Sequence, residues 1–317
     1  MKLVERSFRL EAPEGLGRKP RPELIGPILS SLHGTLEDSV RMGFLHSSRA
    51  RGRIPAMLKR AAEVHYLGHS ADGKEVTLLH FEVARFGSVA GELFEQQLLW
   101  DNGPKADETA FDLLSATVRD IGSLQRDSNR YDHPLLHRIA SYGRLFSKRG
   151  LRRIDVPGAT RALSARIDPE VVVSARNLFA ATPPAKRVRL TGRLDLLGVS
   201  QRVLKLQLDD HNIVTAVWSA TEPFTGLAQL LDQNVVVEGQ AIFRPSGSLL
   251  RVDADAIALA GTQDEFFRKL PIAGQAHDYV AEAARGHVSR TAYASIFGLI
   301  KGEESDEAFA AAVEEMS

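Results

Sequence analysis

Between residues 186 and 260, apolar and polar side chains alternate along five short segments that are separated by turn residues. The segments are Val188–Leu196, Leu204–Leu208, Ile213–Trp218, Val235–Phe243 and Leu250–Ala256. Alternation with a period of two is typical of strands that bury one face, so the pattern predicts five half-buried strands. A short helical stretch is expected over Phe224–Leu231, between the third and the fourth strand. This order of elements limits what the region can fold into more than any other feature of the chain.

Three strands, a short helix and two further strands resemble the five-stranded OB barrel. Gly192 and Gly239 lie within the predicted strands, where glycine permits the sharp bending that closes a small barrel. Trp218 and Phe243 are expected in the barrel core. The polar face has charges of both signs and no aromatic residue, whereas barrels that bind single strands stack bases on aromatics. We therefore favour a protein-binding or structural barrel over one that binds nucleic acid.

The region before residue 156 mixes helical and strand periodicity. A short strand is expected around Phe8 and Leu10, and a hairpin over residues 63–83 turns at Asp72-Gly73. Apolar residues between Ile25 and Phe44 recur at helical spacing, and Pro27 predicts two short helices there. Further helices are predicted around Phe111–Ile121, Leu135–Phe146 and Val172–Phe179. The region is predicted to be an α+β domain of no fold that we can name.

The chain as a whole is expected to be of the α+β class. Thr182-Pro183-Pro184 indicates a domain boundary. The predicted parts are a mixed α+β domain at 1–156, a helical linker at 157–184, an OB-like five-stranded barrel at 185–261, and a helical, acidic C-terminal arm at 262–317.

The residue types present limit which kinds of catalytic, metal and cofactor site the chain can form. The 317 residues include no cysteine, which excludes disulfides, thiolate nucleophiles and cysteine-based zinc and iron–sulfur sites. Forty basic residues balance forty acidic ones, so no overall field draws the chain to nucleic acid or to anionic membranes. Neither a P-loop nor a dinucleotide-binding glycine pattern occurs. We predict no cofactor, no metal and no catalytic residues, although an enzyme is not excluded.

Histidine is the residue type best suited to metal binding here. His133 and His137 share one helix face at a spacing of four, and His65, His69 and His80 lie close together in the predicted hairpin. Neither group completes a known ligand pattern. Half-exposed histidines at a helix start and in a hairpin are the favoured interpretation.

Two basic clusters without acidic residues support an alternative role in nucleic-acid binding. The first spans residues 39–62 and the second spans residues 142–153. Their candidate contact residues are Arg41, Arg49, Arg51, Arg53, Arg144, Lys148, Arg149, Arg152 and Arg153. Solvated loops, or a surface that receives an acidic partner, would explain the same clusters.

The C-terminal arm contains two apolar stripes at helical spacing, separated by a glycine-flanked turn. Lys301–Ser317 carries six acidic residues against one lysine. The stretch Ser295–Phe309, which runs into Val313-Glu314-Glu315, resembles the C-terminal toxin-binding tails of bacterial antitoxins. The resemblance implies that the arm docks on a small ribonuclease toxin, which in that family is often of the PIN class. No basic residue follows Lys301 to reach a toxin active site, which departs from the family pattern.

The residues predicted to bind this partner are the apolar ones of the two stripes. They are Tyr293, Ile296, Phe297, Ile300, Phe309 and Val313. Packing of both stripes against this protein's own barrel is the alternative.

The first nine residues alternate charged and apolar side chains and do not form a signal peptide. No apolar run is long enough to span a bilayer, so an intracellular, cytoplasmic protein without membrane contacts is expected. The leading hypothesis is a non-enzymatic, antitoxin-like binding protein of bacterial type that binds a protein partner. Nucleic-acid binding through the basic clusters and the barrel is the second hypothesis.

Overall fold

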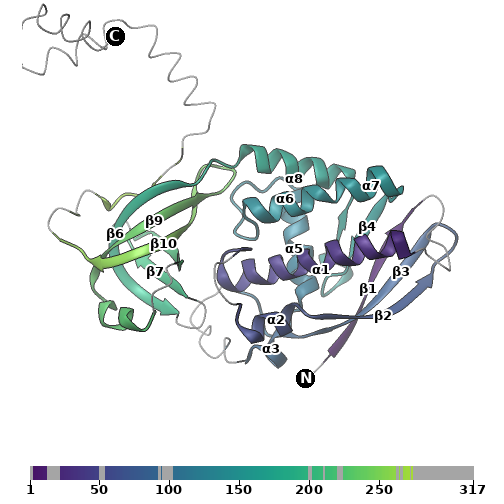
Figure 1. Ribbon diagram of the computed structural model, residues 1–317, viewed down its shortest axis with the longest axis horizontal. Coiled ribbons are helices and arrows are strands. Elements are labelled where there is room, and N and C mark those ends of the chain that lie inside the picture. The colour runs from purple at the N-terminus through teal and green to yellow at the C-terminus, as the bar shows by residue number, and fades with distance from the viewer. Residues whose placement is uncertain are drawn as a thin grey trace, which may run out of the picture. The chain divides into compact units, whose positions relative to one another are not determined.

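An antiparallel sheet of five strands, in the order β2-β3-β1-β4-β5, organises the N-terminal part of the chain (Figure 1). Its strands are β1 (Leu3–Glu11), β2 (Val64–Ala71), β3 (Val76–Ala84), β4 (Arg153–Val156) and β5 (Ala165–Ile167). The predicted hairpin over residues 63–83 is confirmed as β2 and β3, with Asp72 and Gly73 between them. The predicted early strand is β1, which occupies the centre of the sheet because it pairs with both β3 and β4.

The computed structural model describes residues 3–12, 22–49, 54–91, 94, 103–198, 202–209, 211–219 and 224–261, together with 264, 267–271 and 273. These residues belong to one unit that spans Met1–Ala273. We call the part from β1 to α8 the body.

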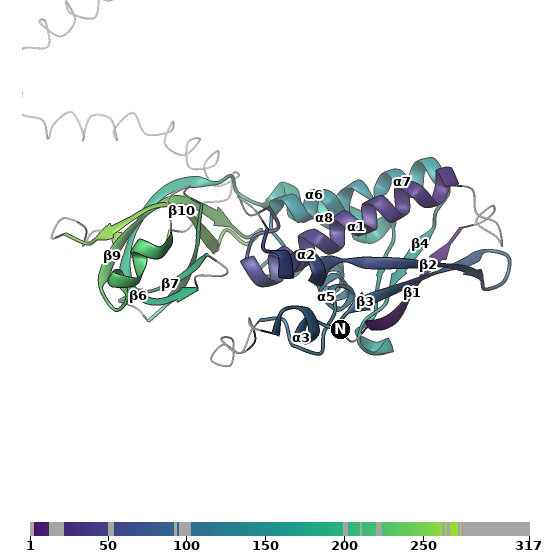
Figure 2. The same ribbon diagram turned by 60° about the horizontal axis from the view of Figure 1, so that its bottom comes forward.

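Helices cover one face of the sheet (Figure 2). They are α1 (Pro22–Leu45), α2 (Ala56–Ala62), α3 (Phe86–Val89), α5 (Ala110–Gly122), α6 (His133–Ser141), α7 (Gly143–Arg149) and α8 (Pro169–Ala181). Phe8 of β1, Phe81 of β3 and Phe111 of α5 pack with ring centroids 4.9–5.9 Å apart, which joins the sheet to the helical layer. The opposite face of the sheet presents Ser7, Arg9 and other polar residues.

The sequence explains where the helices of the body begin. Asp132 and Asp168 cap α6 and α8 by accepting backbone N–H bonds, and each precedes a proline in the first helical turn. Thr109 and Asp112 form a capping box at the start of α5.

Two helix predictions differ from the structure. The prediction of two short helices at Pro27 is wrong, because α1 continues through this proline. Pro27 removes only the bond to the Glu23 carbonyl, near the helix start, and the buried stripe from Ile28 to Val40 continues unbroken. In contrast, the segment Leu135–Phe146 forms two helices, α6 and α7, with Tyr142 between them.

The second sheet is a closed five-stranded barrel in the order β10-β8-β7-β6-β9. Its elements are β6 (Lys186–Gly198), β7 (Val203–Gln207), β8 (Ile213–Trp218), the 3₁₀ helix η2 (Phe224–Leu230), β9 (Asn234–Phe243) and β10 (Leu249–Leu259). β8 and β10 pair in parallel, and the other pairs are antiparallel. This arrangement is compatible with the OB-like barrel expected from the sequence.

The barrel core is apolar and includes Trp218, as predicted. Gly239 lies where β9 approaches β10 most closely: a Cβ at this position would meet the Asp253 carbonyl oxygen and lie 2.9 Å from Ala254 Cα. The pairing register shifts between Ala254 and Ala256 beside it. A glycine is therefore required where the strands bend toward each other.

The α+β fold class, with a closed barrel following a mixed domain, is confirmed. The predicted domain limits stay predictions. β5 and α8, which lie in the segment predicted as a linker, pair with β4 and pack against α6. Within the described residues, no helix is long and apolar enough to cross a membrane.

Candidate functional site

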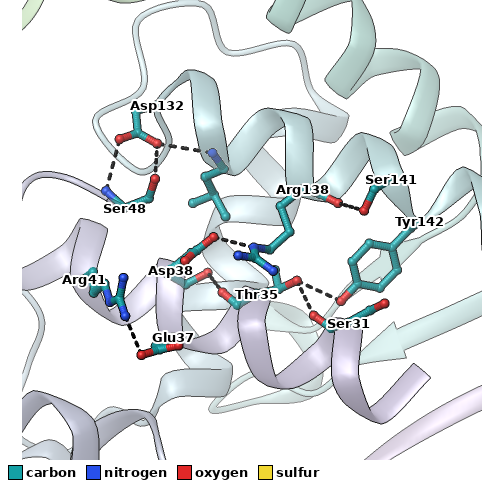
Figure 3. Close-up of polar contacts among 12 residues, drawn as sticks. Ser31, Thr35, Glu37, Asp38, Arg41, Ser48, Asp132, Arg138, Ser141 and Tyr142 are labelled. Carbon is teal, nitrogen blue, oxygen red and sulfur yellow. Dashed lines mark hydrogen bonds and ion pairs between the residues drawn. The ribbon is translucent and has the colours of Figure 1, made fainter. Parts of the chain in front are cut away.

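A buried polar network joins α1 to α6 (Figure 3). The Arg138 Nε of α6 donates to Asp38 of α1, whose side chain is 3 % exposed. Burial raises the pKa of Asp38, and the Arg138 guanidinium opposes that rise. Thr35 and Tyr142 share a hydrogen bond of 3.0 Å between their hydroxyl oxygens, and burial raises the pKa of Tyr142 to about 12. These contacts fix α1 relative to α6.

Gly34 makes room for this network. A Cβ at Gly34 would collide with the Arg138 guanidinium. Glycine therefore lets Arg138 cross the surface of α1 to reach Asp38.

Asp132 joins three segments that are distant in sequence. Its carboxylate accepts hydrogen bonds from the Ser48 backbone N–H (3.0 Å) and the Ser48 hydroxyl (2.5 Å), and from the backbone N–H of Leu135 (3.3 Å). It also pairs at 3.3 Å with Arg251 of β10, and both side chains are almost fully buried. Asp132 therefore connects the end of α1, the start of α6 and the barrel.

The outer face of β7, β8 and β10 is directed toward the body. In the strand register, Lys205 of β7 lies opposite Thr215 of β8. Val252 of β10 lies opposite the next residue of β8, Ala216, which places Arg251 beside Thr215. His46, in the loop after α1, lies close enough to Lys205 and Arg251 for their positive charges to shift its pKa. Burial, followed by the charges of Lys205 and Arg251, lowers the pKa of His46 to about 4. OB barrels bind oligonucleotides on their second and third strands, and here Lys205 of the second strand lies near His46 of the body.

Three arginines on the outer surface of β6 are paired with acids. Arg187 contacts Asp255 at 3.2 Å, Arg189 contacts Asp264 at 2.9 Å, and Arg193 contacts Asp232 at 3.2 Å. Their positive charge is largely neutralised, which disfavours phosphate binding on this surface.

The first predicted basic cluster is only partly within the described residues. Arg41 forms an ion pair with Glu37 at 2.5 Å, and Arg49 is exposed. Arg51 and Arg53 lie outside the described residues. Residues 39–62 contain no acid, but the surface around Arg41 does, because Glu37 lies one helical turn before Arg41 and neutralises its charge.

The residues of the second predicted cluster lie in different environments: some are paired with acids, and others line a hollow. Arg152 pairs with Glu75 at 3.5 Å, and Arg153 pairs with Asp155 at 2.5 Å. Arg144 and Lys148 line a hollow between α1 and the α6–α7 segment. The side chain of Arg149 lies outside the described residues.

The described members of the two clusters do not come together. Ser31 lines the hollow with Arg144 and Lys148, and Arg41 follows ten residues later on α1. At 1.5 Å per residue this places Arg41 about 15 Å further along the helix axis.

The histidines considered for metal binding have other partners. His133 stacks on Phe179 of α8 with ring centroids 3.8 Å apart, and burial lowers the pKa of His133. His80 bridges the hydroxyls of Ser7 and Ser70 at 3.0 and 2.8 Å. Within the described part of the chain, no three histidine, aspartate or glutamate side chains are placed to share a metal ion.

One hollow in the body, which we call the arginine groove, has a volume of about 840 Å³. Its charged lining residues are Arg9, Arg119, Arg153, Arg161, Arg166, Asp155, Asp168 and Glu170. These residues come from β1, α5, β4, the 3₁₀ turn η1 (Arg161–Leu163), β5 and the start of α8. The Ser115 hydroxyl donates to the Leu163 carbonyl at 2.6 Å, which holds η1 against α5.

Charge in the arginine groove is unevenly distributed. Arg153 binds Asp155 through two hydrogen bonds of 2.5 and 2.9 Å, and Arg166 lies 3.0 Å from Asp168. Arg119 and Arg161 form no ion pair with any described residue. Arg9 pairs with Asp72 at 3.3 Å, so Arg119 and Arg161 are the two lining arginines whose guanidinium groups remain available.

Sequence reasoning missed most of the arginine groove. Only Arg153 belonged to a predicted cluster, because the other arginines come from segments between residues 9 and 166 that the sheet brings together. Arg161 and Arg166 are near Arg153 in sequence, but the spacing alone does not show that they share a hollow with Arg9 and Arg119.

The predicted partner-binding residues of the C-terminal arm, Tyr293 to Val313, lie outside the described residues. Comparisons with models of known protein families, with curated proteins and with solved structures find no match.

Proposed function

We propose that this chain is a non-enzymatic binding protein whose arginine groove receives an acidic segment of a partner protein. The observation that carries the proposal is the lining of the groove, where five arginines outnumber three carboxylates. Arg119 and Arg161 are the groups that would pair with the partner, since arginine forks bind carboxylates through two parallel hydrogen bonds.

A protein segment fits this lining better than a nucleic-acid strand. With Arg153 and Arg166 paired to Asp155 and Asp168, Arg119 and Arg161 can pair with two carboxylates but not with the unbroken series of phosphates in a nucleic-acid backbone. Among the residues that the structure describes, no aromatic side chain lines the groove for base stacking. The carboxylates can instead accept hydrogen bonds from backbone N–H groups or basic side chains of a bound polypeptide.

The test is a fluorescence anisotropy titration of the full chain with a labelled glutamate-rich peptide. We expect binding that the double variant Arg119→Gln/Arg161→Gln weakens about tenfold or more, because each charged hydrogen bond contributes about 1.5–3 kcal/mol. The matched control is Lys59→Gln/Lys74→Gln, which removes two exposed lysines elsewhere on the body. This control should bind like the unchanged protein.

An equal affinity for the peptide in the groove variant would contradict the proposal. Tighter binding of a single-stranded oligonucleotide, with an affinity that falls steeply with salt, would favour the nucleic-acid alternative instead.

The C-terminal arm provides the second part of the proposed function. Its sequence supports docking of Ile296, Phe297 and Phe309 on a partner such as a PIN-type ribonuclease toxin. Coexpression and pull-down with and without residues 289–317 tests this part. Retained binding of every candidate partner after the deletion would contradict it, and would leave the groove proposal unaffected.

A further inference from the structure

A second hollow lies between α1 and the α6–α7 segment, and we call it the serine–cation hollow. It is lined by Pro27, Ser31, Ser141, Arg144, Leu145 and Lys148, and its volume is about 520 Å³. In contrast to the arginine groove, none of its described lining residues is a carboxylate.

The two cations of the hollow act together. Arg144 and Lys148 are four residues apart on α7, so they lie on the same side of that helix. Both side chains are exposed, and neither forms an ion pair with any described residue. Together they supply two positive charges at one end of the hollow.

Two hydroxyl groups complete the lining. Ser31 lines the hollow from α1, as Pro27 does, and within the described structure its hydroxyl makes no hydrogen bond, so it can donate to a ligand. The Ser141 hydroxyl donates to the Arg138 carbonyl at 2.6 Å and can turn toward a stronger acceptor. Hydroxyls beside an arginine and a lysine are a combination suited to phosphate oxygens.

The walls of the hollow are held by the buried network described above. Figure 3 shows Ser31 and Ser141 on the two helices that the Thr35–Tyr142 and Asp38–Arg138 contacts join. The helices that carry the ligand groups are therefore fixed relative to each other before any ligand binds, which lowers the ordering cost of binding.

We propose that the serine–cation hollow binds the phosphate group of a small phosphomonoester. The two positive charges match a phosphate dianion, with Arg144 offering a planar fork and Lys148 a compact charge. The volume exceeds the size of a lone phosphate and lies within the range of small-ligand sites, which leaves room for the rest of the molecule. The proposal concerns a different site from the arginine groove and does not depend on it.

The experiment is isothermal titration calorimetry of the full chain with glucose 6-phosphate, and in parallel with inorganic phosphate and with succinate. We expect saturable binding of glucose 6-phosphate, which Arg144→Gln and Lys148→Gln each weaken about tenfold or more. Ser31→Ala should weaken it by a smaller factor. Circular dichroism checks that these surface variants fold.

Two matched controls separate this site from others. Lys59→Gln removes an exposed lysine from α2, and Arg119→Gln/Arg161→Gln removes the available charge of the arginine groove. Both should leave phosphate binding unchanged. If inorganic phosphate binds like glucose 6-phosphate, the phosphate group alone is recognised, which supports the assignment of the hollow.

Three results would overturn the proposal. They are no binding of either phosphate compound at millimolar concentration, unchanged binding in Arg144→Gln and Lys148→Gln, and tighter binding of succinate than of both phosphate compounds.

Discussion

The body and the barrel use charged residues in opposite ways. In the body, Asp38 and Asp132 are almost fully buried, and each depends on partners from other segments. On the barrel, Arg187 and Glu238 belong to a ladder of ion pairs that stays in contact with water. Removing one partner of a buried pair leaves a desolvated charge or dipole, so losing a polar contact in the body costs far more free energy than losing a similar exposed contact on the barrel. The comparison teaches that the body depends on particular polar partners, while the barrel depends on its apolar pattern.

The strongest test of this comparison is Asp132→Ala. The change leaves the buried Arg251 with only the part-exposed Asp253 as a carboxylate partner, removes the acceptor of the Ser48 hydroxyl and removes the cap of α6, so we expect the free energy of unfolding to fall by about 3–5 kcal/mol. Urea denaturation followed by circular dichroism measures the change. The double variant Asp132→Ala/Arg251→Met should recover part of the loss, since no buried charge is then left alone. A loss below about 1 kcal/mol would show that the buried pair is not decisive for the body.

The second test uses pH. The folded state keeps the pKa of His46 at about 4, whereas an unfolded chain binds this proton near pH 6.5. The stabilising effect of a neutral His46 is therefore complete above pH 6.5 and is lost as the pH falls toward 4. We expect it to amount to about 3 kcal/mol, from 1.36 kcal/mol per pKa unit.

Denaturation at pH 7 and pH 4 of the unchanged chain and of His46→Asn isolates this effect. Asparagine tolerates the positive φ of 53° at this position and does not titrate. The variant should lose less stability on acidification. Equal losses in both proteins would rule out the proposed contribution of His46.

A backbone change tests the barrel. Gly239→Ala places a methyl group against the Asp253 carbonyl, which forces β9 and β10 apart. We expect a loss of about 1–3 kcal/mol in the free energy of unfolding, as for other overpacked sites. Gly226→Ala is the matched control, because a Cβ there meets no atom within 4 Å. A similar small change in both variants would mean that the close strand approach is not needed.

The smallest effect is expected for Glu238→Gln. Glu238 lies 3.4 Å from Arg189, and its side chain is 41 % exposed. Screened pairs of this kind contribute little, so we expect a change of at most about 0.5 kcal/mol by urea denaturation. A loss comparable with that of Asp132→Ala would remove the distinction between the two regions.

The same contrast explains what could be predicted from the sequence. The barrel strands follow from alternation, because each strand shows one face to the core and the other to water. The hairpin β2–β3 and the helices α5 and α8 follow from local turn and periodic signals. The strand order of the body depends on pairings between β1, β3 and β4, which are far apart in the chain and carry no local signal.

The candidate sites were harder to predict for the same reason. A run of arginines such as Arg144 to Arg153 is visible in the sequence, but the acids that neutralise Arg152 and Arg153 are not. Glu75 reaches Arg152 from the end of the β2–β3 turn, and Asp155 lies beside Arg153 on the same strand. Only the folded chain shows which cations remain available.

The Asp132–Arg251 pair also has a consequence for the order of events during synthesis. Arg251 follows Asp132 by 119 residues, so at 5–20 residues per second it leaves the ribosome about 6–24 s later. During that interval the nascent body can form its sheet and helices, while Asp132 has only Ser48 and the start of α6 as partners. When β10 emerges, Arg251 pairs with Asp132. Folding of the last barrel strand therefore completes the polar contacts of the body as well as the barrel itself.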